Sequence, residues 1–350
     1  NGFDINLNNL SSKTINSMDL YNGVLIGLNE LKKKGYKIDL HVFDTQYDTS
    51  ITKQILDDST FKKSNLIIGP IYSSNIKKVR DFSRDYSIPM ITPYDIPNQA
   101  LFMYPNLYKY FPSKVTQSAE IGSYLNKVKS DYNIILISNG EDKKSNTYAK
   151  VIAKNYADTL VINDSITSID TLTLLRLYRG ESTSLIRDEV DAKKENLFVV
   201  AASDIPFLTF IFNDILELSN SEKFYRTKLL IIGFQELFDM NSIDIKYKNN
   251  FKLKFTSKGR IDYAHDKTID FIEDYKDKFK MNPQENAFLG NDLLLSMINT
   301  LYPVKKGEVY TPFQGHFNYS DYKQIGLNNG FENKVVKLFE YSDYTLHQIK

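Results

Sequence analysis

Two adjacent hydroxyl side chains, Ser73 and Ser74, follow an apolar run that ends in the turn Gly69-Pro70. Residues 76–86 then carry apolar side chains at helical spacing, so the serines mark the start of a helix. Backbone N–H groups at a helix start attract anionic groups. The pattern predicts a pocket for a small polar molecule, not a reaction. The alternative interpretation is a simple helix cap, a position that serine also favours.

The next apolar run also ends in polar residues. Thr92 lies near the end of residues 88–93, and Tyr94 follows them. In an open parallel sheet, small ligands bind outside the carboxyl ends of the strands. We therefore interpret the hydroxyl-bearing loops at Ser73 and Thr92 as parts of one pocket.

Residues suited to catalysis are sparse. The sequence contains no GxGxxG, Walker A, GxSxG or HExxH motif. It has no cysteine, which excludes disulfides, thiolate metal sites and cysteine nucleophiles. No two of the four histidines stand at ligand spacing; they are His41, His265, His316 and His347. Asp44 and Asp48 are interpreted as turn residues rather than metal ligands. We predict a protein that is not an enzyme and needs no cofactor and no metal.

Composition sets the class of protein. The 350 residues exceed one typical core, so two domains are expected. The 44 basic and 43 acidic residues give a net charge of +1, which excludes a global attraction for nucleic acid or anionic membranes. No apolar run reaches the roughly 18 residues of a membrane span. No secretory signal is recognisable, and the start at Asn1 without methionine is interpreted as an upstream part that was removed or is missing.

Helical and strand patterns alternate along the chain in two blocks. Helices are predicted at 18–34, 50–63, 73–86, 113–128, 145–156, 207–218, 268–279 and 287–302. Strands are predicted at 38–43, around Leu66, and at 90–91, 107–111, 133–137, 160–162, 197–202, 229–232, 251–255 and 335–341. This alternation predicts an α/β protein with parallel sheets and helices on both faces.

Several short motifs occur in an order that resembles the type I periplasmic binding proteins, the superfamily of the branched-chain amino-acid binding proteins. They are Leu20-Tyr21-Asn22-Gly23, Val42-Phe43-Asp44-Thr45, Ile67-Ile68-Gly69-Pro70 with Ser73-Ser74, Ile88-Pro89-Met90-Ile91-Thr92-Pro93 and Ala287-Phe288-Leu289-Gly290-Asn291-Asp292. The likeness covers about residues 17–340. It is greatest to a Bacteroidetes-type subgroup, often annotated for amino-acid transport, in which LysM-type glycan-binding domains precede this domain.

The resemblance implies two doubly wound, Rossmann-like α/β lobes joined by three crossovers, with the ligand between them. Carried over, residues 1–112 and 255–318 form the first lobe, and residues 113–254 and 319–350 form the second. One departure is plain: the family begins with a strand ahead of its first helix, and residues 1–16 are too polar to form it. Either that strand lies upstream, or this edge of the sheet is built otherwise.

The resemblance also implies a ligand site. In amino-acid-binding members, groups after the third and fourth strands hold the carboxylate, and Ser73 and Tyr94 stand there. Ser145 and Asp204 stand where the second lobe of those members has tyrosines, and the acid that takes the ammonium falls at Gln235 or Glu236. The predicted ligand-binding residues are Tyr72, Ser73, Ser74, Thr92, Tyr94, Ser145, Asp204 and Glu236.

Two functions stay open at this point. The first is an extracytoplasmic solute-binding or sensory protein, in the periplasm or cell envelope, that holds an amino-acid-like ligand. The second is a ligand-free scaffold, such as an envelope lipoprotein, that docks other envelope proteins or reaches peptidoglycan through upstream domains. Bulky side chains such as Tyr72 and Tyr94 would then fill the cleft. With two aromatic walls replaced, free amino acids are expected to bind no better than about millimolar, near −4 kcal/mol.

Overall fold

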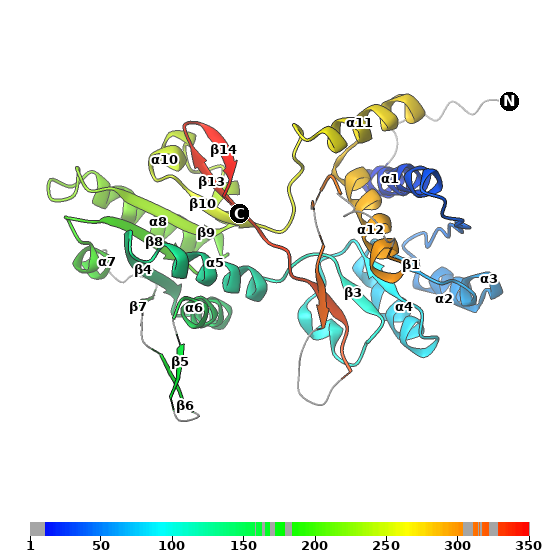
Figure 1. Cartoon of the computed structure of the whole chain (residues 1–350), viewed down its shortest axis with the longest axis horizontal. Helices are drawn as coiled ribbons and strands as arrows, with labels where there is room; N and C mark the ends of the chain where they lie inside the picture. The colour runs from blue at the N-terminus through cyan, green and yellow to red at the C-terminus, as the bar shows by residue number, and fades with distance from the viewer. Residues whose placement is uncertain are drawn as a thin grey trace. The chain divides into compact units, whose positions relative to one another are not determined.

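The computed structural model describes residues 11–157, 159–162, 165–168, 172–178, 184–303, 311–313, 315, 317–321 and 328–349. The chain forms two compact units (Figure 1). Unit 1 comprises Asn1–Pro112 and Gly259–Val335, and unit 2 comprises Ser113–Lys258 and Val336–Lys350. The chain therefore passes between the units three times.

The sheet of unit 1 has the strand order β1-β2-β3-β12-β11. Its strands are β1 (Ile67–Ile68), β2 (Met90–Thr92), β3 (Leu107–Lys109), β12 (Phe331–Asn333) and β11 (Tyr319–Asp321). The first four run parallel, and β11 is antiparallel to β12. Residues 319–335, which we expected in the second lobe, lie in unit 1 because β12 pairs with β3 and β11 with β12.

Helices cover both faces of this sheet. They are α1 (Ser12–Lys33), α2 (Thr49–Asp57), α3 (Ser59–Lys62), α4 (Ser73–Asp85), the short 3-10 helix η2 (Asn98–Leu101), α11 (Asp266–Phe279) and α12 (Glu285–Leu301). Ile91 packs with Leu20 of α1 and Leu293 of α12, whereas the preceding residue, Met90, packs with Val79 of α4. Successive strand residues thus feed two separate hydrophobic clusters, as the alternation of side chains along a strand requires.

Two glycines let α1 and α12 approach closely (Figure 1). A Cβ at Gly23 would lie 1.8 Å from the carbonyl oxygen of Ala287, and one at Gly290 would lie 2.0 Å from that of Leu20. Asp19 adds a polar tie, because its carboxylate accepts hydrogen bonds from Ala287 N at 2.7 Å and from Tyr275 Oη at 2.8 Å. α1 therefore caps the start of α12.

The main sheet of unit 2 has the order β14-β13-β10-β9-β8-β4-β7. The strands are β4 (Tyr132–Asn139), β7 (Thr173–Leu177), β8 (Glu195–Val200), β9 (Leu229–Phe234), β10 (Lys254–Ser257), β13 (Lys337–Ser342) and β14 (Thr345–Gln348). The block β10-β9-β8-β4-β7 is parallel, and β13 and β14 are antiparallel additions. β5 (Thr159–Ile162) and β6 (Ser165–Ser168) form a separate hairpin.

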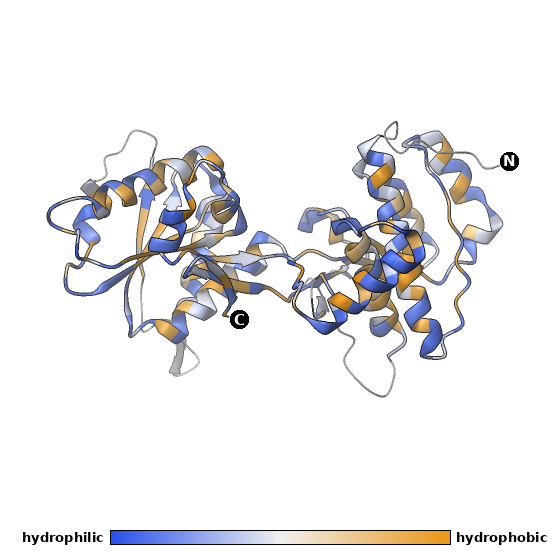
Figure 2. Cartoon of the chain, turned by 90° about the horizontal axis from the view of Figure 1, so that it is seen from above, coloured by the Kyte–Doolittle hydropathy of each residue, from blue (hydrophilic) through white to orange (hydrophobic). Residues whose placement is uncertain are grey.

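Two hydrophobic clusters also flank this sheet. The helices of unit 2 are α5 (Lys114–Val128), α6 (Lys143–Tyr156), α7 (Ser184–Glu189), α8 (Ile205–Ser219), α9 (Gln235–Asp239) and α10 (Ile245–Asn250). Side chains of α5 and α6 share one cluster with Leu136 and Val199, and side chains of α7 and α8 share the other with Ile135 and Phe198. Figure 2 shows the hydrophobic residues of both units along the strands and on the helix sides that face them.

The predicted strand at 38–43 is not a strand among the described residues. Leu40 is 40% exposed and Val42 is 61% exposed, although both would be buried inside a sheet. The physical reason is pairing: an extended segment becomes a strand only when a neighbour takes its backbone hydrogen bonds, and no described strand lies beside this one. The expectation for the polar start of the chain concerns residues 1–10, which lie outside the described ones, as does His316.

Candidate functional site

The start of α4 lies at the carboxyl end of β1. Ser73 and Ser74 are its first two residues, and both are exposed. Tyr72 is the N-cap residue, with φ −115° and ψ 141°, and its side chain gives no capping hydrogen bond. Within the described part of the chain, neither serine has a partner for its hydroxyl or its backbone N–H. Two hydroxyls and two N–H groups are therefore available to an external molecule.

Thr92 ties the loop after β1 to the loop after β2. Its side chain is fully buried, and its hydroxyl donates to the carbonyl oxygen of Pro70 at 2.9 Å. The same oxygen accepts a hydrogen bond from Tyr94 N at 3.2 Å. Thr92 thus positions the two loops, whereas Tyr94 is 43% exposed and can contact a ligand.

Tyr72 is held against the start of α1. Its hydroxyl donates to the carbonyl oxygen of Lys13 at 3.0 Å, and its ring centroid lies 4.3 Å from that of Tyr47. The ammonium of Lys13 lies 4.6 Å from the Tyr47 ring centroid and 6.0 Å from that of Tyr72. This contact anchors Tyr72 by its hydroxyl and its ring beside the two serines.

Asn75 was missed by the sequence prediction. It is the third residue of α4 and 1% exposed, and neither polar atom of its amide has a hydrogen-bond partner in the part of unit 1 that is described. An unpaired buried amide costs about 1–3 kcal/mol. An asparagine directly after Ser73 and Ser74 was the one available signal, and it reads equally well as first-turn chemistry.

In unit 2, the acid at the end of β9 is already paired. Glu236 lies in the first turn of α9, and its carboxylate accepts a hydrogen bond from the ammonium of Lys114 on α5. The same ammonium lies 4.5 Å from the ring centroid of Phe234. Gln235, the alternative position for the acid, accepts a hydrogen bond from Ser257 Oγ at 2.9 Å. The carboxylate and the aromatic face thus already hold a cation, which belongs to the chain itself.

Tyr148 adds an aromatic ring that the sequence did not reveal. It lies on α6, and its centroid is 5.4 Å from that of Phe234 with an interplanar angle of 82°. Burial, followed by the carboxylates of Asp142 and Glu236, raises the pKa of Tyr148. An aromatic residue therefore stands near the acid one turn beyond the position expected from the resemblance.

The two other residues predicted in unit 2 serve the fold. Ser145 is fully buried, donates to the carbonyl oxygen of Ala201 at 2.7 Å and accepts from Asn139 N at 2.8 Å. Asp204 is exposed and caps α8, accepting from Phe207 N at 3.1 Å. Asp44 and Asp48, interpreted as turn residues, accept hydrogen bonds from the backbone N–H groups of Gln46 and Ser50, which confirms that interpretation.

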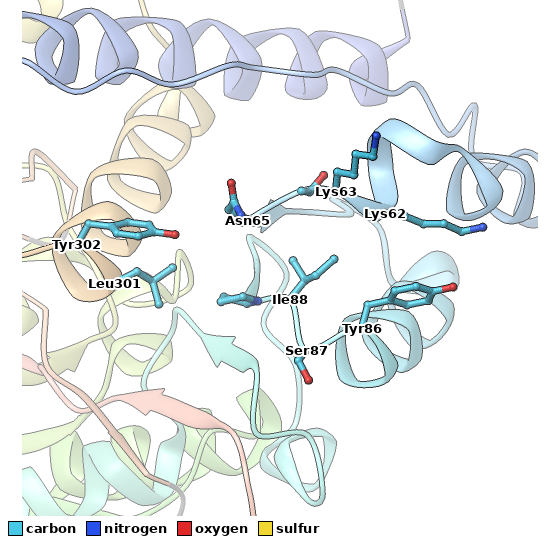
Figure 3. A pocket seen from close by; sticks show the side chains of 10 residues that line it. Lys62, Lys63, Asn65, Tyr86, Ser87, Ile88, Leu301 and Tyr302 are labelled. Carbon is cyan, nitrogen blue, oxygen red and sulfur yellow. The ribbon is translucent and has the colours of Figure 1, made fainter.

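A groove of about 480 Å³ lies on unit 1, away from the predicted site (Figure 3). It is lined at the amino ends of β1 and β2 by Lys62, Lys63, Ser64, Asn65, Tyr86, Ser87, Ile88, Pro89, Leu301 and Tyr302. None of the eight predicted ligand-binding residues contributes to it. The helices that surround it present their carboxyl ends, where lysines compensate the helix dipoles.

Two further searches were restricted to the described residues. Among them, no three His, Cys, Asp or Glu side chains come together as a metal site would require. None of the described helices combines the length and the apolar character needed to cross a membrane.

Comparisons with known proteins point to one family and one fold. The family described as "Receptor family ligand binding region" matches residues 28–226, more than half of the chain. No curated protein sequence matches. A Desulfitobacterium hafniense ABC transporter substrate-binding protein in complex with Leu is 13% identical, with a TM-score of 0.57, and the match covers 94% of this chain and 95% of that one.

Two further solved structures widen the comparison. A putative branched-chain amino acid ABC transporter structure from Rhodospirillum rubrum has a TM-score of 0.61 at 10% identity, covering 97% and 96% of the two chains. The C-domain of Haemophilus influenzae LpoA, a regulator of PBP1A, has a TM-score of 0.51 at 14% identity, covering 95% and 96%. At these identities the likeness shows the fold alone: two α/β units of the type I periplasmic binding protein kind.

Proposed function

The chain belongs to the family of receptor ligand-binding regions, and from that premise we propose that it is an extracytoplasmic solute-binding or sensory protein for a small polar, amino-acid-like ligand. Members of the family and the neighbouring structures are binding proteins, and the proposed role is non-catalytic. The cell envelope is the proposed location. We include in this proposal the LysM-linked, Bacteroidetes-type subgroup, with peptidoglycan or envelope proteins among its partners.

The observation that carries the proposal is the uncapped start of α4. Every other described helix of eight or more residues has a side-chain acceptor in its first turn. The acceptors are Ser11 for α1, Asp48 for α2, Ser113 for α5, Asp142 for α6, Asp204 for α8, His265 for α11 and Asp19 for α12.

At α4, Ser73 and Ser74 instead leave hydroxyls and N–H groups unpaired. A helix N-terminus of this kind favours a carboxylate or another anionic group. Hydrogen bonds to a charged group contribute about 1.5–3 kcal/mol each. Association itself costs several kcal/mol, so a ligand held by this set alone binds weakly. The proposed ligand therefore carries a carboxylate, which α4 receives.

A second candidate function is a scaffold, and the Lys114–Glu236 pair favours it. Amino-acid binding needs a free acceptor for the ligand's ammonium, and Glu236 already accepts from Lys114. A scaffold would dock another cell-envelope protein without a small ligand. The LpoA neighbour, printed as a regulator of PBP1A, is an example of this fold in such a role.

Calorimetric titration of the purified chain with a panel of amino acids and simple carboxylates tests the proposal. We expect binding in the millimolar range that is lost in the double variant Ser73→Ala, Ser74→Ala. The matched control is Ser130→Ala, an exposed serine in unit 2, which leaves binding unchanged. At 100 times its Kd a ligand also stabilises the chain by about 2.7 kcal/mol. No binding by any member of the panel, together with capture of a defined envelope protein, would favour the scaffold.

A further inference from the structure

The sheet of unit 1 has one open edge, formed by β1. β1 is the outermost strand, and its only described partner is β2. Ile67 N and Gly69 N donate to the β2 side, to the carbonyl oxygens of Pro89 and Ile91 at 2.9 and 2.8 Å. Because successive residues of a parallel strand bond to opposite neighbours, the N–H and C=O of Ile68 point away from β2. Those two groups are available to a further strand.

A second set of backbone groups nearby is also unpaired. Residues 37–44 have no backbone–backbone hydrogen bond within the described chain. Ile38 packs against the same hydrophobic cluster as Ile68, the cluster beneath α1 and α12. Between these ends, Leu40 and Val42 are 40% and 61% exposed. A segment with apolar side chains and an unpaired backbone thus belongs to the same core as the open edge of β1.

The direction of α1 shows which way a further strand would run. α1 begins at the carboxyl edge of the sheet, because the carbonyl oxygen of Lys13 accepts from Tyr72 Oη, just beyond β1. It ends near the amino edge: Tyr36, three residues beyond α1, donates to the carbonyl oxygen of Tyr302, which lines the groove at the amino ends of β1 and β2 (Figure 3). α1 therefore runs opposite to β1, as the crossover helix of a parallel βαβ unit does.

The order of elements places this strand between the two unpaired segments. After α1 the chain passes through residues 38–43, α2, α3, β1, α4 and β2. In the doubly wound order 2-1-3-4-5, the first strand lies between the second and the third. Residues 38–43 and β1 take the second and third places, so the position between them belongs to the strand that leads into α1.

We propose that the open edge of unit 1 receives one more β-strand, parallel to β1, from polypeptide on the N-terminal side of Ser11. This strand pairs with Ile68 on one side and with residues 38–43 on the other, and it covers Leu40 and Val42. Because a central parallel strand is buried on both faces, the donated segment is a short, nearly continuous run of Val, Ile and Leu. Its carboxyl end lies beside Tyr72 and completes that edge of the sheet.

An N-terminal extension tests this proposal. One version of the chain carries five residues, Val-Ile-Val-Leu-Ile, ahead of Asn1, and the matched control carries five residues of Ser and Asn. Amide hydrogen exchange is measured across both proteins. We expect the apolar extension to slow exchange at residues 38–43 and at Ile68 by about tenfold or more relative to the control. Equal exchange at those amides in the two proteins would overturn the proposal.

A disulfide test identifies the occupant, and the absence of cysteine from the chain makes it clean. A cysteine in the apolar extension is combined with Val42→Cys or, as a control, with Tyr225→Cys, an equally exposed position in unit 2. We expect an intramolecular disulfide with Val42→Cys only. Disulfide-linked dimers with Val42→Cys, or sedimentation of the unextended chain as a dimer, would assign the edge to a second copy and overturn the proposal. Failure of ligand binding in the calorimetric test leaves both readouts unaffected.

Discussion

The polar groups at the carboxyl edges of the two sheets differ in their partners. In unit 1, Ser73, Ser74 and Asn75 have side chains without partners among the described residues. In unit 2, Glu236 is paired with Lys114, and Ser145 uses its hydroxyl twice inside the fold. Unpaired polar groups cost stability, so a protein that retains them gains something else from them. The difference assigns ligand contact to unit 1 and internal support to unit 2.

The largest effect is expected at the helix contact that fixes α1 beside the edge of unit 1. Gly23→Ala would place a Cβ 1.8 Å from the backbone oxygen of Ala287, and we expect a loss of about 3 kcal/mol or more. Gly27→Ala is the control on the same helix, since its Cβ would first meet the side chain of Asn291 at 3.0 Å. Urea unfolding measures both. Equal losses would contradict the close approach of α1 and α12.

A serine in each unit sharpens the comparison directly. Ser145→Ala removes a buried donor and leaves Asn139 N unpaired, so we expect a loss of about 2 kcal/mol and no change in ligand affinity. Ser74→Ala is expected to change stability by less than about 0.5 kcal/mol and to weaken ligand binding. Chemical unfolding and calorimetry on both variants test this. The reverse pattern would exchange the roles given to the two units.

Removing the internal cation should open the edge of unit 2. Lys114→Met leaves Glu236 without its partner, and we expect a loss of about 1 kcal/mol because both side chains are partly exposed. The freed carboxylate beside Phe234 should then favour ligands that carry an ammonium group. Lys127→Met, at an exposed lysine of the same helix, is the control. Unchanged amine affinity in Lys114→Met would mean that the pair does not block this site.

Two buried asparagines test whether missing partners carry the cost. Asn75→Leu replaces an amide with no partner, and we expect stability to rise by about 1 kcal/mol while ligand binding weakens. Asn196→Leu removes an amide that bonds to Asp191 and Lys194, and we expect a loss of stability. Thermal and urea unfolding compare the two. A loss in Asn75→Leu as large as in Asn196→Leu would show that Asn75 has an internal partner.

The smallest effect concerns a carboxylate far from both edges in the chain. Burial, with a contribution from Glu217, raises the pKa of Asp214 on α8 to about 6. Since this exceeds the unfolded value of about 3.9, the protonated form stabilises the fold at low pH. The contribution is lost as pH rises from about 4 to 6, by less than about 1 kcal/mol because the group is largely solvated. Asp214→Asn should remove this pH dependence. A similar slope in the variant would assign it elsewhere.

Local patterns predicted much of unit 1 but little of the pairing in unit 2. The apolar run before Gly69-Pro70 and the serines after it predicted β1 and the start of α4, because each signal lies within a few residues of the next. The Lys114–Glu236 pair joins residues 122 positions apart, and nothing local in either segment announces it. Tyr148 was missed for the same reason: its place beside Phe234 depends on how α6 packs on the sheet.

Residues 38–43 show the same limit from the other side. Their apolar alternation predicts a strand, yet a strand exists only with a neighbour to accept and donate its hydrogen bonds. Residues 319–335 fell in the other lobe of the prediction because the pairing of β12 with β3 spans more than 200 positions. Both outcomes depend on non-local contacts, which periodicity does not record.

The central claim is that unit 1 holds the ligand's carboxylate while the acid of unit 2 is already satisfied. Calorimetric titration of the unmodified chain with leucine and with 4-methylpentanoate, the same skeleton without the amine, tests it most directly. The two affinities are predicted to agree within about threefold and to fall together in the Ser73→Ala, Ser74→Ala variant. Leucine binding more than tenfold tighter than the carboxylate, a gain of over about 1.4 kcal/mol, that disappears in Glu236→Gln would contradict the account.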